Sequence, residues 1–397
     1  MHARELLRQL NPAAFWTGVT AFLWYAFAGI PLHLAVAAQL ELSQGETASW
    51  ILIVWLTSAA ASIAAAFYYR VPIPITWTIP GIIYLGALAG RFSYAEIVGA
   101  NLLAGILITL MGALGIGKRI MTWLPLPIVM GMFAGSILEY ATRLVAATVE
   151  DLGIAGTCVL CYLGGRLVGD PRLPPVGLAA VGGTVAIALS GPTALGEIDW
   201  SAPHLVIPDM RFGAAAFAAI TLPMIVLSMG LGNVQGLGFL QAQGYKVAVS
   251  PISVLVGIAS VLNAVFGGHP AIVARTGVAM LAAKDAGPAE ARYWGVVISA
   301  LLTLAIAFAG ATIGALVGVL PRSYVFALAG LAILGALQDS LEKSFSGALR
   351  FGALVAFIVA LTPFAVLGIS SAFWSLVAGL VASALIERAE LLKHWRS

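Results

Sequence analysis

The sequence predicts an all-α polytopic membrane protein with fourteen spans, arranged as two inverted repeats of seven. Of its 397 residues, 61% are hydrophobic and 9% are charged, whereas about 25% of the residues of a soluble domain are charged. Apolar runs of about twenty residues recur from Phe15 to the C-terminus, and each is long enough to cross a bilayer. A one-sided distribution of basic residues and a pair of proline-broken apolar segments indicate the repeat.

Charged residues, prolines and glycines mark the ends of the predicted spans. Those of the first half cover residues 13–38, 46–69, 78–90, 95–116, 122–140, 151–168 and 174–190. After a polar connection, those of the second half cover residues 213–237, 250–267, 271–284, 290–318, 323–338, 347–368 and 370–387. The third and tenth spans are too short to cross a bilayer as regular helices, so we expect half-helices there.

Basic residues favour one side of this arrangement. With the N-terminus in the cytoplasm, fifteen basic residues lie inside and only four lie outside, namely Arg91, Arg143, Arg211 and Arg322. This is the positive-inside bias of membrane proteins. No cleavable signal precedes the first span, so we expect it to be retained. The count predicts that both termini lie in the cytoplasm, and we expect the chain to cross a bacterial inner membrane.

Two apolar segments are interrupted by proline at corresponding positions of the two halves. An offset of 196 residues relates Pro74 to Pro270, Gly81 to Gly277 and Gly99 to Gly295. Broken segments in such positions point to the binding site of a transporter. Irregular backbone at membrane depth must be buried in protein or line a cavity. We therefore expect residues 71–77 and 266–270 to form short strands that meet near the middle of the bilayer.

The half-helices that follow these strands favour an anionic ligand. Their N-termini are expected near Thr78 and Ala271, where unpaired N–H groups would converge. Arg275 lies nine residues before Lys284 at the cytoplasmic interface, which places it about 13 Å deep. A charge at that depth costs about 2.5–3.5 kcal/mol, so it needs a partner. We favour a substrate carboxylate as that partner, and Glu139 is the structural alternative.

Two histidines lie in apolar surroundings. His269 stands at the junction of strand and half-helix, where it could carry a proton at physiological pH. A histidine that only hydrogen-bonds freed backbone carbonyls is an equal alternative. His33 lies near the outer end of the first span, where we expect an interfacial position.

Polar and aromatic residues of two further spans complete the candidate site. Asn233 and Gln235 bring amides into the apolar eighth span, where they could contact substrate or join helices. Tyr25 in the first span and Trp77 before the third could flank an aromatic ring, although ordinary packing is the more frequent role of such residues.

The chain resembles the benzoate/proton symporter (BenE-type) family. The cues are Phe266-Gly267-Gly268-His269-Pro270 before the tenth span, Leu222-Pro223 through Asn233 in the eighth, and Gln243-Gly244-Tyr245 after it. The resemblance implies the fourteen-span fold shared with nucleobase and sulfate permeases. It also implies a core domain that moves against a gate domain, with substrate held between the third and tenth spans. The core would comprise residues 1–117 and 213–319, and the gate residues 118–212 and 320–397.

Two departures refine the expected substrate. Nucleobase relatives use acidic residues in the eighth and tenth spans, whereas this sequence has Leu231, Asn233, Gln235 and Thr276 there. Benzoate-type members usually have a small apolar residue at the position of Arg275. An arginine is typical of anion-handling relatives of the sulfate permease type, so the substrate could be a carboxylate other than benzoate or an inorganic anion.

We therefore predict proton-coupled uptake of benzoate or a related small carboxylate by an elevator-like movement. Arg275 and the half-helix N-termini would bind the carboxylate. The other predicted substrate contacts are Thr78, Ala271, Ile272 and His269 beside it, Asn233, Gln235 and Thr276 to orient it, and Tyr25 and Trp77 against the ring. His269 is the first candidate for proton coupling and Glu139 the second.

Other functions find less support in the sequence. An inorganic-anion transporter or channel on the same fold is the main alternative. An intramembrane enzyme lacks the usual motifs, and no ATP-binding motif occurs. We expect no cofactor, no metal and no nucleic-acid partner, since the basic residues flank the spans. A homodimer through the gate domain is expected from analogy of fold alone.

Overall fold

The computed structural model describes residues 10–116, 125–170, 173–190, 202–362, 364–366 and 369–396. The first half of the chain forms α2 (Pro12–Gln39), α3 (Gln44–Tyr69), β1 (Ile75–Trp77), α4 (Ile79–Gly86), α5 (Tyr94–Ala113), α7 (Leu126–Glu150), α8 (Ile154–Val168) and α9 (Pro175–Leu189). Ser43 and Ser93 start α3 and α5 with capping boxes, in which each serine pairs with a glutamate three residues later.

The second half begins with one long helix that is interrupted by π-helical turns. It comprises α10 (Ala214–Ala216), η2 (Phe217–Thr221), α11 (Leu222–Ile225), η3 (Val226–Val234) and α12 (Gln235–Ala242). Then follow α13 (Val249–Val265), β2 (Ala271–Val273), α14 (Arg275–Leu281), the 3-10 turns η4 (Lys284–Ala286) and η5 (Ala289–Ala291), α15 (Tyr293–Phe308), α16 (Gly310–Val319) and α17 (Arg322–Phe345). The chain ends with α18 (Arg350–Leu361), β3 (Ala365–Val366), β4 (Ile369–Ser370), α19 (Ser371–Ile386) and α20 (Arg388–Arg396).

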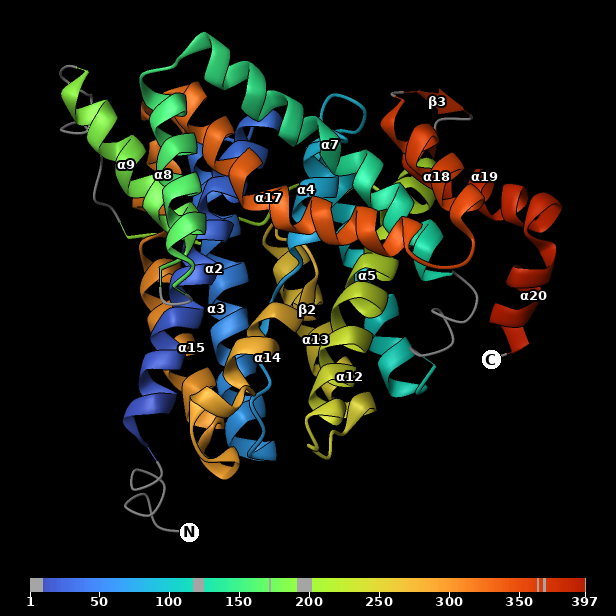
Figure 1. Ribbon diagram of the computed structural model, residues 1–397, viewed down its shortest axis with the longest axis horizontal. Helices are drawn as coiled ribbons and strands as arrows, with labels where there is room; N and C mark the ends of the chain where they lie inside the picture. Colours follow the sequence, from blue (N-terminus) through green and yellow to red (C-terminus); the bar gives the residue numbers. More distant parts are fainter. Residues whose placement is uncertain are drawn as a thin grey trace.

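Helix lengths confirm the polytopic membrane architecture. Within the described residues, 7 helices are long and apolar enough to cross a bilayer, and five shorter apolar helices accompany them. Together with the half-helices α4 and α14, they account for the fourteen predicted spans. Figure 1 shows α4 and α14 on opposite sides of the β1–β2 ribbon, each leading toward a different end of the molecule.

The repeat is visible in where equivalent elements begin. The offset of 196 residues relates the first residue of β1 to that of β2, that of α4 to that of α14, and that of α7 to that of α17. The structure therefore confirms the inverted repeat at the level of single residues.

Several element ends differ from the sequence-based expectation. The second strand covers 271–273 instead of 266–270, so Ala271 lies in a strand and α14 begins at Arg275. The reason is that Phe266 and Gly267, with a φ of 86° at the glycine, form the turn that ends α13. Helix α7 continues to Glu150 and α17 to Phe345, beyond the predicted ends at 140 and 338. The expected boundary between residues 117 and 118 and the predicted start of the fifth span at 122 lie outside the described residues.

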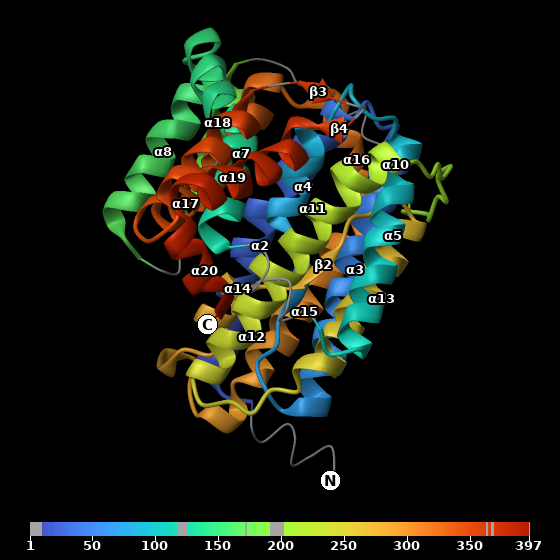
Figure 2. The same ribbon diagram turned by 90° about the vertical axis from the view of Figure 1, so that its right-hand side faces the viewer.

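The helices form two packed groups (Figures 1 and 2). In the first, here the ribbon group (α2–α5 and α10–α16), α13 packs along α5 and α15 along α3 and α2. In the second, here the flanking group (α7–α9 and α17–α19), α7 packs against α17 and α18. Glycines allow the close contacts, because a Cβ at Gly112 would lie 2.7 Å from the backbone nitrogen of Val254. The two groups meet mainly along α2 and α17.

Candidate functional site

A two-stranded antiparallel ribbon lies where the two repeats meet. Thr76 of β1 pairs with Ile272 of β2, and these two residues are themselves equivalent in the repeat. Beyond the strands, the N–H of Thr78 donates to the carbonyl of Pro270 at 3.1 Å. The N–H of Ala274 donates in the same way to Pro74 at 3.0 Å. The ribbon is therefore pseudo-symmetric about its centre, as an inverted repeat requires.

Side chains of neighbouring helices satisfy the outer edges of the ribbon. The hydroxyl of Ser62 donates to the carbonyl of Ile75 and accepts from its N–H, both at 2.8 Å. On β2, Ser260 accepts from the N–H of Ala271 at 2.9 Å, and Ser228 donates to its carbonyl at 2.6 Å. These bonds satisfy backbone groups that an irregular segment would otherwise leave unpaired at membrane depth, where water is absent.

Asn233 belongs to this edge set. Its Oδ1 accepts from the N–H of Val273 at 2.8 Å, and its Nδ2 lies 3.3 Å from the Met229 sulfur. The amide is buried, so both of its ends have a protein partner in this conformation. Gln235 is half-buried, and its Nε2 has no hydrogen-bond partner within the described chain. Gln235 therefore retains an uncommitted buried donor.

The two half-helices start differently. Thr78 caps α4, because its Oγ1 accepts from the N–H of Gly81 at 3.1 Å. The equivalent residue Ala274 has no side chain that could cap α14. The next residue, Arg275, is half-buried, and Thr276 is exposed, whereas Thr78 is fully buried. The accessible polar groups therefore gather at the start of α14.

Arg275 has an acidic partner that differs from the expected one. Its Nη2 lies 3.4 Å from Oδ1 of Asp339 on α17, and Lys343 binds the other carboxylate oxygen at 2.6 Å. Glu139, the anticipated structural partner, pairs instead with Arg143 four residues along α7 at 2.5 Å. The idea of an Arg275–Glu139 pair is therefore wrong. Glu139 and Arg143 line a separate polar cavity of about 420 Å³ with Arg91.

His269 and His33 lie together in a buried aromatic cluster. The indole N–H of Trp50 donates to Nδ1 of His269 at 3.0 Å, so a neutral His269 carries its proton on Nε2. His33 approaches the Gly29 carbonyl with Nδ1 at 2.8 Å, so its Nε2 is a free acceptor. The ring centroids are 5.6 Å apart, and neither Nε2 has a hydrogen-bond partner of good geometry within the described chain, although the Thr78 backbone lies close to His269. The interfacial position expected for His33 is wrong, because the residue is 0% exposed.

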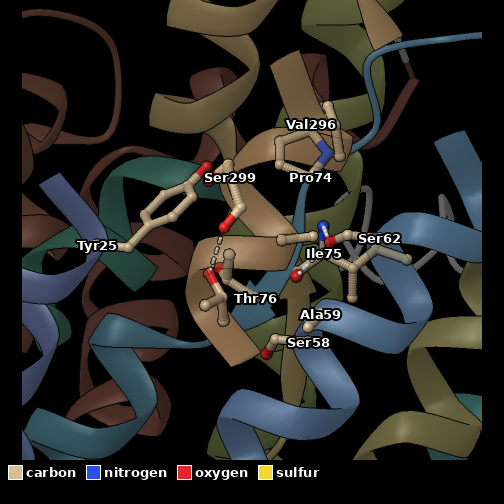
Figure 3. A pocket seen from close by; sticks show the side chains of 11 residues that line it. Tyr25, Ser58, Ala59, Ser62, Pro74, Ile75, Thr76, Val296 and Ser299 are labelled. Carbon is tan, nitrogen blue, oxygen red and sulfur yellow. Dashed lines mark hydrogen bonds between the residues drawn. The ribbon is translucent and has the colours of Figure 1, made fainter. Parts of the chain in front are cut away.

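Tyr25 and Trp77 are also buried. Trp77 stacks on Trp55 with centroids 4.1 Å apart and meets Tyr25 edge-on at 6.4 Å. The Tyr25 hydroxyl lies against Gly277 of α14, where a Cβ atom would overlap it. The same hydroxyl reaches a small cavity with Thr76 and Ser299, which has room for about one water molecule (Figure 3). In this conformation the aromatic rings pack against one another rather than around an open space.

The structure thus brings most of the predicted residues to the ribbon but not to one surface. Ala271, Ile272, Thr78, Trp77 and His269 lie within or beside it and are buried. Arg275 and Thr276 lie at its accessible end, while Glu139 sits on α7 in the flanking group. Sequence reasoning missed Asp339 because it falls one residue beyond the predicted end of its span.

Comparisons with known proteins agree with this architecture. The BenE family profile, described as benzoate membrane transport protein, matches residues 8–385. The inner membrane protein YdcO of Escherichia coli (strain K12) is 26% identical over 379 residues, covering 94% of this chain and 95% of that protein. The benzoate membrane transport protein of Acinetobacter baylyi is 28% identical over 339 residues, covering 84% and 85%.

Solved structures show the same fold. The transmembrane domain of the cyanobacterial bicarbonate transporter BicA superposes with a TM-score of 0.61 at 18% identity, covering 96% of this chain and 98% of that one. SLC26A9 superposes with a TM-score of 0.60 at 14% identity, covering 94% and 65%. At such identities the likeness concerns the fold alone.

Proposed function

Because the chain belongs to the BenE family of benzoate membrane transport proteins, we propose that it carries benzoate or a related small aromatic carboxylate together with protons. The observation that carries the substrate class is Arg275, a half-buried cation beside the ribbon where the two repeats meet. We also propose that the protein lies in a bacterial inner membrane with both termini in the cytoplasm, an orientation that the positive-inside bias supports. The family is one of membrane transporters rather than enzymes.

Arg275 is suited to a carboxylate by its chemistry. A guanidinium presents paired N–H donors that match the two oxygens of a carboxylate. The contact that Arg275 makes at 3.4 Å involves Nη2, which leaves other donors for a ligand. Thr276 offers an exposed hydroxyl next to it, and Ile272 supplies an apolar wall. Because α14 has only 7 residues, the charge of Arg275 outweighs any contribution from the helix dipole.

The rest of the ring site requires a change of conformation. Tyr25 and Trp77 are proposed to flank the aromatic ring, Asn233 and Gln235 to orient the ligand, and Ala271 and Thr78 to line it. The orienting role is best supported for Gln235, because its Nε2 has no hydrogen-bond partner within the described chain. Movement of the ribbon group as a core domain against the flanking group as a gate domain would expose the site to each side in turn.

Proton coupling is proposed to involve His269. Its Nε2 is a buried polar atom without a hydrogen-bond partner in the described chain, and His33 offers a matching acceptor nearby. Glu139 is a weaker candidate, because it already pairs with Arg143 away from the ribbon. A homodimer through the flanking group is a further proposal that rests on fold analogy.

The direct test of substrate binding is Arg275→Gln. We expect the affinity for benzoate, measured by calorimetry on purified protein, to fall at least about ten-fold, because hydrogen bonds to a charged group contribute about 1.5–3 kcal/mol. Arg322→Gln removes the same charge from an exposed position at the start of α17 and should bind normally. Normal binding by Arg275→Gln would remove the basis of the proposal.

The test of coupling is uptake into proteoliposomes. An inward proton gradient should drive accumulation of benzoate, and a protonophore should abolish it. His269→Gln should lose gradient-driven accumulation and keep benzoate binding, whereas His204→Gln, at an exposed loop position, should behave as the unmodified protein. Gradient-driven uptake that survives His269→Gln would exclude His269 as the proton carrier.

An inorganic anion is the second candidate substrate. A single accessible cation does not require an aromatic acid, and the fold resembles those of a bicarbonate transporter and an anion transporter. Chloride, sulfate or bicarbonate flux that is insensitive to the protonophore and unaffected by benzoate would favour this alternative.

A further inference from the structure

Asp339 is an acid that the proposed transport cycle has not used. It extends from α17 in the flanking group to Arg275 in the ribbon group, 64 residues earlier in the chain. One carboxylate oxygen faces Arg275 at 3.4 Å, and the other binds Lys343 at 2.6 Å. The contact therefore joins the two groups of helices at the residue proposed to recognise substrate.

The residue that corresponds to Asp339 in the first repeat carries the opposite charge and makes a different contact. Asp339 is the equivalent of Arg143, at the offset of 196 residues, so the corresponding positions of α17 and α7 carry opposite charges. Around Arg143, the two groups meet through the Gln39 amide of α2, which lies 3.1 Å from the Tyr140 hydroxyl and, in the orientation that satisfies both of its ends, accepts from Arg143 at 3.2 Å. A Cβ at Gly86 would overlap that tyrosine hydroxyl, so packing is tight there. Around Asp339 the contact with α14 is an ion pair instead.

The ion pair has the properties of a replaceable contact. The side chains of Arg275 and Asp339 are 40% and 36% exposed, so neither partner is enclosed by the protein. A single long contact also leaves the paired donors of the guanidinium unused, whereas a free carboxylate could engage two of them. Exposed pairs of this kind change an equilibrium by no more than about five-fold. A ligand carboxylate can therefore displace Asp339.

We propose that Asp339 is a resident counter-ion that holds Arg275 in the empty transporter and is displaced by the carboxylate of the substrate. This inference rests on the proposed role of Arg275 in substrate binding. Asp339 then sets the affinity as an internal competitor, and its displacement breaks the ion pair between α14 and α17. Lys343 moderates the competition, because it holds the other oxygen of Asp339.

Benzoate binding to three purified variants tests the competition. Asp339→Asn removes the competing charge and should tighten binding by about three- to five-fold. Lys343→Gln leaves Asp339 to Arg275 alone and should weaken binding by a similar factor. Glu342→Gln removes a negative charge from an exposed neighbouring position and should leave the affinity unchanged. A purely structural Asp339 would give no gain in affinity, so unchanged or weaker binding by Asp339→Asn overturns the inference.

A measurement without substrate separates this inference from the proposed function. In a chain with Cys158 and Cys161 replaced by alanine, Thr276→Cys places an exposed thiol next to Arg275. The measured quantity is the ratio of the thiol's reaction rate with a negatively charged reagent to its rate with a positively charged one. Adding Asp339→Asn should raise this ratio, and adding Glu342→Gln should leave it unchanged. If the unmodified protein binds no benzoate, the proposed function fails, and this ratio alone decides whether Asp339 neutralises Arg275. An unchanged ratio overturns the inference.

Discussion

At the scale of single residues, polar side chains near the ribbon divide into those that hold the backbone and those that remain free. Asn233, Ser228 and Ser260 are committed to backbone groups of β2. The remaining groups are less committed, because Arg275 makes one long contact with Asp339, Thr276 is exposed, and the Nε2 atoms of the two histidines have no partner within the described chain. A buried polar atom without a partner is unusual enough to suggest a functional role. The free groups are therefore where substrate and proton chemistry is expected.

Replacing Asn233 tests whether the side chains bonded to the ribbon backbone stabilise the protein. Asn233→Leu keeps the approximate volume but leaves the N–H of Val273 unpaired in a buried position. We expect the free energy of unfolding to fall by about 1–3 kcal/mol, measured by denaturant titration in detergent. Thr148→Val removes a hydroxyl that donates within its own helix, to the carbonyl of Leu144, and should change stability by less than about 0.5 kcal/mol. Equal stability of the two variants would mean that Asn233 does not stabilise β2.

The residue scale also shows what sequence could and could not predict. Arg275 and His269 stand out because charge and imidazole are rare in apolar runs, and both lie at the ribbon. The partner of Arg275 was not predictable, because contacts between residues 64 positions apart depend on how the helices pack. His33 was misplaced for the same reason, since α3 and the ribbon enclose the C-terminal half of α2 with Trp50, Trp55 and Trp77.

At the scale of elements, the path of the eighth span along β2 depends on glycine. A Cβ at Gly232 in η3 would lie 2.5 Å from the Ile272 side chain. One at Gly236 in α12 would lie 2.6 Å from the carbonyl of Val273. Both distances are shorter than van der Waals contact. The glycines therefore allow the backbone of this span to approach the strand, and the π-helical turn of η3 occurs at the same place.

Gly232→Ala and Gly238→Ala form a matched pair on this helix. The first should destabilise the protein by about 1–3 kcal/mol, because Ile272 and β2 must shift, and benzoate binding should weaken with it. The second meets no atom within 4 Å and should be neutral or stabilising by up to about 1 kcal/mol. Thermal unfolding and calorimetry on the two variants would show the difference. Similar behaviour of both would mean that close approach to β2 is unimportant.

An element could be predicted where residues within its own segment indicate it. Proline and glycine in the broken segments indicated two strands and two half-helices, and the offset of 196 residues relates their observed positions. The expected position of β2 was too early because the Phe266–Gly268 turn satisfies its groups by bonding back to Asn263 of α13. Such a turn and an extended strand have the same composition, so only the three-dimensional structure distinguishes them.

At the scale of the whole molecule, the polar contacts found between the described parts of the two groups of helices lie in two places. One set joins Tyr140 to Gln39, and another joins Asp339 to Arg275. Inside the ribbon group, by contrast, α5 and α13 pack so closely that a Cβ at Gly257 would lie 2.6 Å from the backbone of Thr109. This contrast fits a rigid group that moves past a second one, as an elevator-like mechanism requires.

Cross-linking tests that movement. In a chain without Cys158 and Cys161, a short bifunctional thiol reagent on Gln39→Cys and Tyr140→Cys would tie the ribbon group to the flanking group. We expect benzoate uptake into proteoliposomes to stop, and to return when a reducible reagent is cleaved, because the two groups can no longer slide. The matched control is Arg70→Cys with Tyr293→Cys, at a pair of side chains hydrogen-bonded at 2.8 Å, which ties the end of α3 to α15 within the ribbon group. Its uptake should persist after cross-linking, since no relative motion is expected inside that group. Full uptake by the first cross-linked variant would exclude movement of one group past the other as the transport step.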